Sequence, residues 1–421
     1  MSLKGIFSTS VQAMNSQAQS LANISTNIAN VNTTGYKAQD THFETMLSGV
    51  APPNLPLLGV NTFDFRNVSK QGIIATTNRT FDLAISGRGF FVTNTENNAS
   101  GVWQYTRDGA LFGKAMTLSS DSNGDGVRDQ GTLLVTADGS YVYGWKADDD
   151  GRFLENNSLG ALTPILYNNN AVFPPKATET VTLQANLAAS DTGRQTVGLP
   201  YVDLEGRSRT LTLGFSATLG PDWNLDVAAR DPNGDDATME LFPPSISFDG
   251  TGRINSLSFN TLSVVIRDSA SSQSIAVDLT RLTQFGGGNG LTVQNITQDG
   301  FIAGRLQNTY FTNDGILVGG YSNGKVQNLY KLALATFPAE NKLKARPGNV
   351  FEQTAEAGGL RLSGIDNRST TRIVVGALEA SNVDLTDQFS KMIVTQRAYS
   401  STATALRTAD EMTQAARDLK R

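Results

Sequence analysis

The feature that most constrains this chain is a long stretch without charge near its N-terminus. From Gly5 to Tyr36 the sequence runs for 32 residues without Asp, Glu, Lys, Arg or His. A helix on the surface of a monomer normally shows charged side chains to water. This stretch is instead rich in Ser, Thr and Asn, which bury at lower cost than ions. We therefore expect a helix that is stable only when neighbours surround it, rather than a helix in a large monomeric core, which would contain more Leu and Ala.

Apolar residues within this stretch follow a heptad spacing. The positions, separated by steps of four and three, are Phe7, Val11, Met14, Ala18, Leu21, Ser25 and Ile28. Such spacing keeps one stripe of a helix facing a partner helix. The helix should end near Asn30 and Asn32, which tolerate non-helical backbone, and before Gly35, which can supply a positive φ.

A second, longer helix is expected from about residue 383 to residue 419. The same spacing recurs at Leu385, Phe389, Met392, Gln396, Tyr399, Ala403 and Leu406, and it continues after a one-step slip at Ala409, Thr413 and Ala416. The outer face carries charges that include Lys391 and Arg397. Either Asn382 or Asp384 can cap the first turn. The matching seams predict that the two terminal helices pair as a coiled coil.

The sequence between these helices has the pattern of a β protein. Eleven Asn-Gly or Asp-Gly pairs, which favour tight hairpin turns, lie between Asp108 and Gly324. The segments between the turns alternate: "TVTLQANL" and "TLTLGF" each place their apolar residues on one face. The fold class is therefore mainly β, with discontinuous β-rich domains inserted between N- and C-terminal helices.

Shifts in composition suggest where these domains begin and end. The segment "GVAPPNLPLLGV" at residues 49–60 is typical of an extended linker. We predict an N-terminal helix and linker over residues 1–70, a first β domain in two parts over 71–150 and 297–357, a second, outer β domain over 151–296, and a C-terminal segment and helix over 358–421.

Catalysis and nucleic-acid binding find little support. The net charge is −5 and no basic run occurs, which argues against nucleic acid as a partner. The chain has no cysteine and a single histidine, His42, expected in a polar turn after the first helix. No nucleophile elbow or phosphate-binding loop is present. We predict no enzyme activity, no cofactor, no catalytic residue and no metal. No apolar run is long enough to cross a membrane, and the N-terminus lacks the apolar core of a cleaved signal peptide.

One segment resembles an ion-binding loop. Asp121, Asn123, Asp125, Gly126 and Asp129 have the spacing of positions 1, 3, 5, 6 and 9 of an EF-hand calcium loop, but Thr132 stands where the bidentate acid belongs. No flanking helices are expected. We prefer an acidic hairpin extension and keep a modest Ca²⁺ loop as the alternative.

Both ends of the chain resemble the bacterial flagellar rod and hook proteins. The resemblance rests on "SLANISTNIANVNTTGYKAQ" near the N-terminus and on "LEASNVDLTDQFSKMIVTQRAYSSTATALRTADEMTQAARDL" near the C-terminus. Interior segments such as "DLAISGRGFFV", "YTRDGAL" and "DGFIAGRL" agree. Lys37, the "TVTLQANL" segment and the length favour the hook-forming members. Thr402 departs from the family pattern, where Asn is expected after "AYSS".

The resemblance implies a function and a set of partners. It implies a subunit that polymerises with itself into a flexible hollow tube, the hook, outside the cell. It also implies contacts with the rod, the hook cap and the hook–filament junction proteins, and delivery by the flagellar type III export apparatus without signal cleavage. The residues expected to mediate self-assembly are Phe7, Val11, Met14, Leu21, Asn23, Asn27, Ile28, Asn30, Asn32, Thr34, Gly35, Tyr36, Asn382, Leu385, Phe389, Met392, Gln396, Arg397, Tyr399 and Leu406.

Two other functions stay open at the level of sequence. The chain could be a distal rod or hook-associated flagellar protein. It could also be a secreted β-rich binding module with oligomerising helical tails, in which Trp103, Trp145 and Trp223 line a ligand groove. We prefer core or domain-junction packing for these three side chains.

Overall fold

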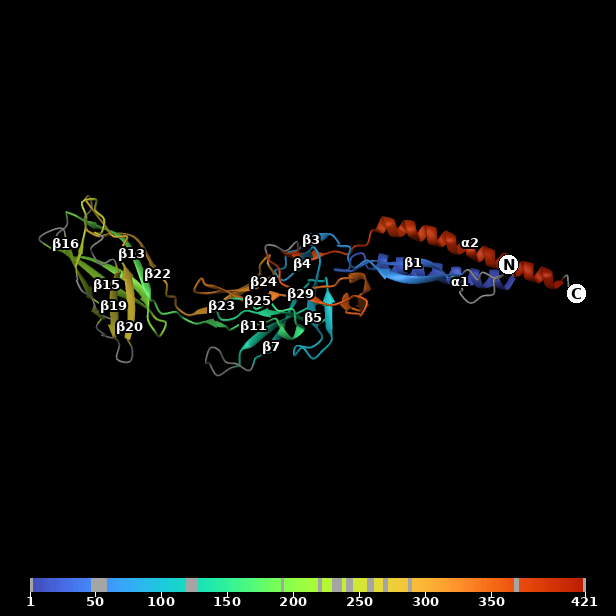
Figure 1. Ribbon diagram of the computed structural model, residues 1–421, viewed down its shortest axis with the longest axis horizontal. Helices are drawn as coiled ribbons and strands as arrows, with labels where there is room; N and C mark the ends of the chain where they lie inside the picture. The colour runs from blue at the N-terminus through green and yellow to red at the C-terminus, as the bar shows by residue number, and fades with distance from the viewer. Residues whose placement is uncertain are drawn as a thin grey trace. The chain divides into compact units, whose positions relative to one another are not determined.

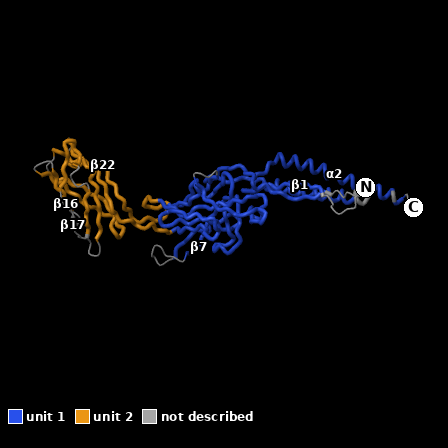
Figure 2. Tube along the Cα trace, in the orientation of Figure 1, with its two compact units in different colours: residues 1–169, 308–319, 326–421 blue, residues 170–307, 320–325 orange. Residues whose placement is uncertain are grey.

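The protein consists of two compact units, and the first of them contains both terminal helices. The computed structural model describes residues 3–46, 59–118, 128–190, 193–218, 222–228, 237–239, 245–255, 261–267, 272–286, 290–366 and 371–418. Unit 1 comprises Met1–Asn169, Asn308–Gly319 and Val326–Arg421, and unit 2 comprises Asn170–Gln307 and Gly320–Lys325 (Figure 2). The predicted class, β structure inserted between two terminal helices, is confirmed.

Unit 1 begins and ends with the two long helices that the sequence predicted. Helix α1 spans Leu3–Ala29 and helix α2 spans Leu385–Asp418. They lie side by side with both chain ends at the same end of the pair, so they are antiparallel (Figure 1). We call this helix pair, together with the hairpin described next, the stem.

A β-hairpin that the sequence analysis did not predict packs against α1. Its strands β1 (Gln39–Met46) and β2 (Gly59–Arg66) pair antiparallel. The expected linker residues 49–58 lie outside the described residues. The expectation of a polar turn at His42 was wrong, because His42 lies in β1 and stacks on Phe63 with ring centroids 5.4 Å apart. Alternating aromatic and polar residues explain why these segments form strands.

The rest of unit 1 is a β domain. Its early strands are β3 (Ile74–Thr76), β4 (Leu83–Ser86), β5 (Phe90–Asn94), β6 (Trp103–Thr106), β7 (Phe112–Thr117), β8 (Gln130–Val135), β9 (Tyr141–Lys146), β10 (Thr163–Pro164) and β11 (Leu166–Asn168). Its late strands are β25 (Val326–Leu332), β26 (Leu334–Thr336), β27 (Lys344–Arg346), β28 (Val350–Glu352), β29 (Arg361–Ser363), β30 (Arg372–Val375) and β31 (Ala377–Glu379). Two 3₁₀ turns span Leu159–Ala161 and Glu340–Lys342.

Pairing between early and late strands closes this domain. One sheet runs in the order β25-β9-β5-β6-β28-β27, and β3 pairs with β31 while β4 pairs with β30. The chain therefore leaves the stem, builds the domain and returns to the stem beside its starting point. Aromatic side chains fill the core, with Phe90, Tyr105 and Trp145 almost fully buried.

Unit 2 places most of its strands in two sheets that share one core. Its strands are β12 (Val172–Phe173), β13 (Thr180–Ala188), β14 (Gln195–Val202), β15 (Ser208–Ala217), β16 (Asp222–Ala228), β17 (Ala237–Met239), β18 (Ser245–Ser247), β19 (Thr261–Arg267), β20 (Ser272–Asp278), β21 (Thr283–Phe285) and β22 (Thr292–Gln298). Strands β23 (Gly304–Phe311) and β24 (Ile316–Tyr321) contribute residues to both units. One sheet has the order β17-β19-β20-β13-β21 with β22 beside β13, and the other has the order β14-β15-β16-β18. Strand β12 pairs with β23 instead.

The predicted strand faces in unit 2 are confirmed. The residues Val181, Leu183, Ala185 and Leu187 of β13 and Leu211, Leu213 and Phe215 of β15 are all buried in the shared core. The alternation follows from the two-residue period of a strand, which sends every second side chain to the same face.

One detail of the sequence analysis changes, and the preferred core packing of the tryptophans is confirmed. Residues 151–169, expected in the second domain, belong to unit 1, because β10 pairs with β9 and β11 pairs with β8. The tryptophans do not line a groove. Trp145 and Trp223 are 2% exposed, and the half-buried Trp103 packs edge-on against Tyr143 with ring centroids 4.9 Å apart.

Candidate assembly interface on the stem

The base of the stem is held by one fully bonded amide. The side chain of Asn27, at the end of α1, is 0% exposed. Its Nδ2 donates to the carbonyl of Gln39 at 2.8 Å and to Oε1 of Gln388 at 3.0 Å. Its Oδ1 accepts from the hydroxyl of Tyr36 at 3.1 Å and from the backbone N–H of Gln39 at 2.9 Å. An Asn amide offers two donors and two acceptor sites, so this residue joins α1, α2 and β1 without an unsatisfied atom.

Asp384 and Asn382 have different roles at the start of α2. Asp384 is the cap, because its Oδ1 accepts from the backbone N–H of Thr386 at 2.8 Å. Asn382 instead bonds to the N-terminal segment. Its Oδ1 accepts from the N–H of Ala38 at 2.7 Å, and its Nδ2 donates to the carbonyls of Asn67 and Lys70, each at 3.0 Å. The predicted cap is therefore Asp384, and Asn382 ties the start of α2 to the segment after α1.

The turn after α1 needs its glycine. Gly35 has φ +68°, and a Cβ at this position would lie 2.8 Å from the backbone nitrogen of Asp108. A side chain there would meet both strain and a clash with backbone. Beside it, Asn30 Nδ2 donates to the carbonyl of Thr26 at 2.8 Å, and the carbonyl of Thr34 accepts from Asn349 Nδ2 at 3.0 Å. The geometry of this turn fixes how the chain passes from helix to β domain.

A buried ion triad, which the sequence analysis did not identify, lies under this turn. Nζ of Lys37 is 2.5 Å from Oε1 of Glu379, and Nη1 of Arg107 is 3.3 Å from Oε2. All three side chains are at most 1% exposed. Burial lowers the pKa of the Lys37 amine, and the negative charge of Glu379 partly opposes this. Removing one member of a buried ionic group leaves uncompensated charge, so the triad locks three distant segments together.

The sequence offers one signal for the triad: Glu379 is a single charged residue with uncharged neighbours on both sides. Glu379 lies within "GALEAS", where it is the single charged residue of a short strand. Charged residues are almost never fully buried unless they are paired. The pattern marks such a residue for burial, but it does not identify Lys37 and Arg107 as its partners.

The two helices pair, and only part of the predicted seam is covered within the chain. The buried residues of the helices are Ser16, Asn23, Ile24 and Asn27 on α1 and Gln388, Thr395 and Ala409 on α2. Asn23 is covered by the hairpin, where it donates to Thr41 and Asp64. Ala409 belongs to the predicted seam, whereas the seam residues Phe7, Val11 and Phe389 are 39%, 41% and 50% exposed. The heptad spacing therefore identified an apolar stripe that the chain itself covers only in part.

The remaining predicted residues follow the same division. Half-buried side chains are Met14, Leu21, Ile28, Asn30, Thr34, Met392 and Leu406. Exposed side chains are Asn32, Leu385, Gln396, Arg397 and Tyr399. The buried set comprises Asn23, Asn27, Gly35, Tyr36 and Asn382. The fully buried members are therefore mainly polar, whereas the large apolar members are half-buried or exposed.

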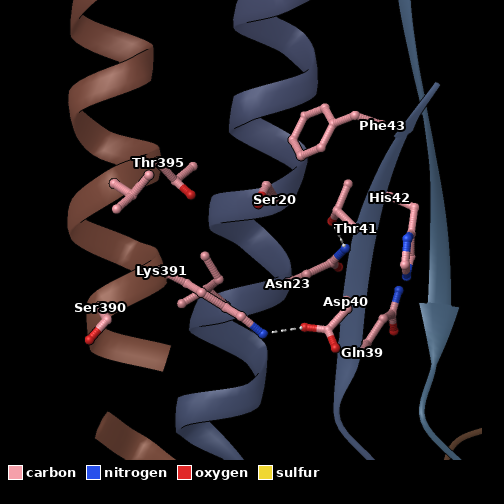
Figure 3. A pocket seen from close by; sticks show the side chains of 12 residues that line it. Ser20, Asn23, Gln39, Asp40, Thr41, His42, Phe43, Ser390, Lys391 and Thr395 are labelled. Atoms are coloured by element: carbon pink, nitrogen blue, oxygen red, sulfur yellow. Dashed lines mark hydrogen bonds and ion pairs between the residues drawn. The ribbon is translucent and has the colours of Figure 1, made fainter. Parts of the chain in front are cut away.

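A groove opens on the side of the stem between α2 and the hairpin. It has a volume of about 530 Å³ and is floored by α1, where Ile24 is 5% exposed. Its walls include Val394, 67% exposed, and Phe43, 47% exposed. Lys391 reaches from α2 to β1, with Nζ 3.0 Å from Oδ1 of Asp40 (Figure 3). Burial alone would lower the pKa of Lys391, but hydrogen bonds to Asp387 and Asp40 outweigh it and raise the pKa.

The described part of the chain offers no metal centre. It holds no group of three or more His, Asp or Glu side chains that could share an ion. The candidate loop residues Asp121, Asn123 and Asp125 lie outside the described residues. Asp129, at the end of that loop, is buried and its Oδ2 accepts from Asn168 Nδ2 at 2.8 Å. None of the described helices is long and apolar enough to span a bilayer.

The fold and the stem define a class of protein: a β-rich subunit whose two terminal helices pair and leave large apolar side chains exposed. Comparisons with known proteins place it more closely. Residues 7–37 match a family described as flagella basal body rod protein, residues 168–301 match the flagellar basal body protein FlaE D2 domain, and residues 374–419 match the flagellar basal body rod FlgEFG protein C-terminal family. The chain belongs to the flagellar rod and hook protein family, a family of structural proteins.

Individual hook proteins align with all or nearly all of the chain. The chain is 29% identical to the flagellar hook protein FlgE of Rhizobium meliloti (strain 1021), covering 100% of both chains. It is 28% identical to FlgE of Salmonella typhimurium, covering 96% of this chain and 98% of the relative. A crystal structure of the Helicobacter pylori flagellar hook protein FlgE2 is similar with a TM-score of 0.49 and 13% identity, over 73% of this chain and 100% of that one.

Proposed function

We propose that this chain is the structural subunit of the flagellar hook. Many copies assemble into a flexible hollow tube outside the cell, which acts as a universal joint and transmits motor torque to the filament. The observation that carries the proposal is the distribution of side chains on the stem. Polar residues satisfy one another inside the chain, while Phe7, Val11 and Phe389 are left on the surface. Large exposed apolar residues in one region are typical of a surface that contacts other protein.

A universal joint requires two kinds of contact. Contacts near the axis must hold, and apolar ridges on the paired helices supply contacts of that kind by burying area. Contacts farther out must slide as the tube bends, so they should be polar, wet and individually weak. Unit 2 suits the second requirement, since its exposed ion pairs, such as Lys176–Asp299 and Arg207–Asp203, are worth little each.

The partners follow from the same proposal. The subunit contacts other copies of itself along the tube. At the two ends of the tube it meets the rod, the cap and the hook–filament junction proteins. The flagellar type III apparatus exports it, and no signal peptide is cleaved. The relatives that align over the whole chain carry the name hook protein, which supports the hook over the rod and over a secreted binding module.

The test is a charge placed on the exposed ridge of α2. Phe389→Asp changes a side chain that is 50% exposed, so the monomer should fold normally. Burying an unpaired carboxylate between subunits costs several kcal/mol, so we expect the critical concentration for assembly to rise at least tenfold, which corresponds to about 1.4 kcal/mol. Sedimentation and electron microscopy measure the polymer.

A matched control is available in unit 2. Phe285 is 52% exposed, and Phe285→Asp makes the same chemical change away from the stem. This variant should assemble within about threefold of the unmodified chain. Normal tubes from Phe389→Asp, or an equal loss from both variants, would contradict the assignment of assembly to the stem.

A further inference from the structure

The groove between α2 and the hairpin has the chemistry of a site for an uncharged helix. Its walls expose Val394 and Phe43, and its floor is the buried Ile24. The lysine beside it, Lys391, is already engaged by two carboxylates, those of Asp40 at 3.0 Å and Asp387 at 2.9 Å. A partner that carries Asp or Glu would therefore find no free cation among these groups. An apolar and neutral ridge could enter without leaving an ion unpaired.

The chain itself contains one described segment with that chemistry. The first half of α1 exposes Phe7 and Val11, with Met14 half-buried beside them, at the i, i+4 and i+7 positions of a helix. Anchors at these positions are the usual signature of a helix that binds in an apolar groove. No charged residue occurs from Gly5 to Tyr36, so the faces beside the ridge are neutral too.

The ridge cannot enter the groove of its own chain. Val11 and Ile24 lie on one continuous helix, and thirteen residues of helix separate them by about 20 Å. The ridge also lies on the opposite side of α1 from the buried stripe that forms the groove floor. We therefore propose that the Phe7–Val11–Met14 ridge of one subunit docks into the groove formed by α1, α2 and β1 of a second subunit.

This contact has a direct consequence for the assembly. Two different surfaces of the same chain meet, so the interface is heterologous, and each added subunit offers a new groove to the next. If the stems are parallel, neighbouring subunits are offset by about 20 Å along the helix direction, the distance from ridge to groove. Such a contact propagates without closing on itself. The inference rests on the proposed function, because it names the contact that builds the tube.

Disulfide cross-linking of assembled tubes tests the contact. The chain has no cysteine, so only introduced thiols react. In the Val11→Cys, Val394→Cys double variant, oxidation should produce a ladder of covalent multimers, because each subunit supplies one thiol to each of two neighbours. The two single variants, mixed before assembly, should stop at dimers. Both positions are exposed, so both variants should fold and assemble.

Matched pairs test other arrangements. In Val11→Cys, Phe389→Cys, the second thiol lies on the other exposed side of α2. In Phe63→Cys, Val394→Cys, the first thiol lies on the hairpin, where Phe63 is 41% exposed. A ladder from either pair with none from Val11 and Val394 would overturn the proposal, as would an intrachain disulfide or tubes that fail to cross-link. Absence of tubes from the unmodified chain would instead refute the proposed function.

A charge pair provides a second test that needs no thiols. Val11→Lys and Val394→Asp should each reduce assembly at least tenfold, because each puts an unpaired charge into the contact. The double variant should recover most of that loss, since the two charges then face each other across the interface. Losses that simply multiply in the double variant would contradict direct contact between the two positions.

Discussion

At the scale of single residues, polar side chains organise the stem. Asn27 joins α1, α2 and β1 through four hydrogen bonds, and its partner Gln388 is 361 residues away in the chain. The uncharged N-terminal stretch indicated that such residues would be enclosed, and this is true of Asn23 and Asn27. Their partners could not be predicted, because a hydrogen bond between residues so distant in sequence leaves no local pattern.

Burial also affects one carboxyl group beside the turn after α1, and this leads to a pH prediction. Burial raises the pKa of the Asp108 carboxyl from its ordinary value of 3.8 to about 6. The folded state therefore holds a proton that the unfolded state has released between these values. The stability contributed by this group is fully present below pH 3.8 and is lost as the pH rises through 6, at a cost of about 2–3 kcal/mol.

Asp108→Asn should remove this dependence. The amide oxygen can still accept from the backbone N–H of Ala110, which bonds to Oδ1 at 3.0 Å. The free energy of unfolding of the variant, relative to the unmodified chain, should increase by about 2–3 kcal/mol between pH 4 and pH 7. Urea unfolding at several pH values measures it. A difference that stays constant over this range would show that Asp108 ionises normally in the folded chain.

At the scale of elements, helices were easier to predict than the surfaces through which they pair. The heptad spacing predicted both helices to within a few residues, because a periodic apolar stripe is a local property. It predicted that the stripe of α1 packs on α2, but Val11 and Phe389 of the predicted seam are exposed, whereas Ala409 is buried. A sequence pattern shows that a helix has an apolar face, but it does not show whether the surface that covers this face belongs to the same chain.

The polar contact between these elements should nevertheless be essential to the stem. In Asn27→Leu, the hydroxyl of Tyr36, the N–H and carbonyl of Gln39 and the amide of Gln388 lose their partner, and buried groups without a partner cost about 1–3 kcal/mol each. We expect a loss of about 3–5 kcal/mol and faster hydrogen exchange along α1.

A matched substitution on the same helix isolates the effect. Asn15 is exposed, so Asn15→Leu should change stability by less than about 0.5 kcal/mol. Denaturant unfolding compares the two variants. Equal stability of Asn27→Leu and Asn15→Leu would mean that the network around Asn27 contributes little to holding the helices and the hairpin together.

At the scale of the whole molecule, the β structure was visible in the sequence but its division was not. Turn pairs and alternating segments predicted the strands of both units, and strands such as β13 agree residue by residue. The border near residue 169 was missed because short strands β10 and β11 return to unit 1, a choice decided by pairing with β9 and β8. Strands of two and three residues are too short to show the alternation of apolar and polar residues that marks a strand.

Separate cores predict separate unfolding. The core of unit 2 is built from residues of β13 to β22 alone, and the cores of unit 1 draw on strands from both parts of that unit. Calorimetry of the unpolymerised chain should therefore show two transitions. Leu213, 0% exposed in unit 2, and Leu332, 1% exposed in unit 1, provide matched probes. Leu→Ala in a core costs about 2–5 kcal/mol, so each variant should lower one transition by several degrees. If Leu213→Ala and Leu332→Ala lowered the same transition equally, the two units would unfold as one cooperative body, and the outer domain could not move as an independent element when the tube bends.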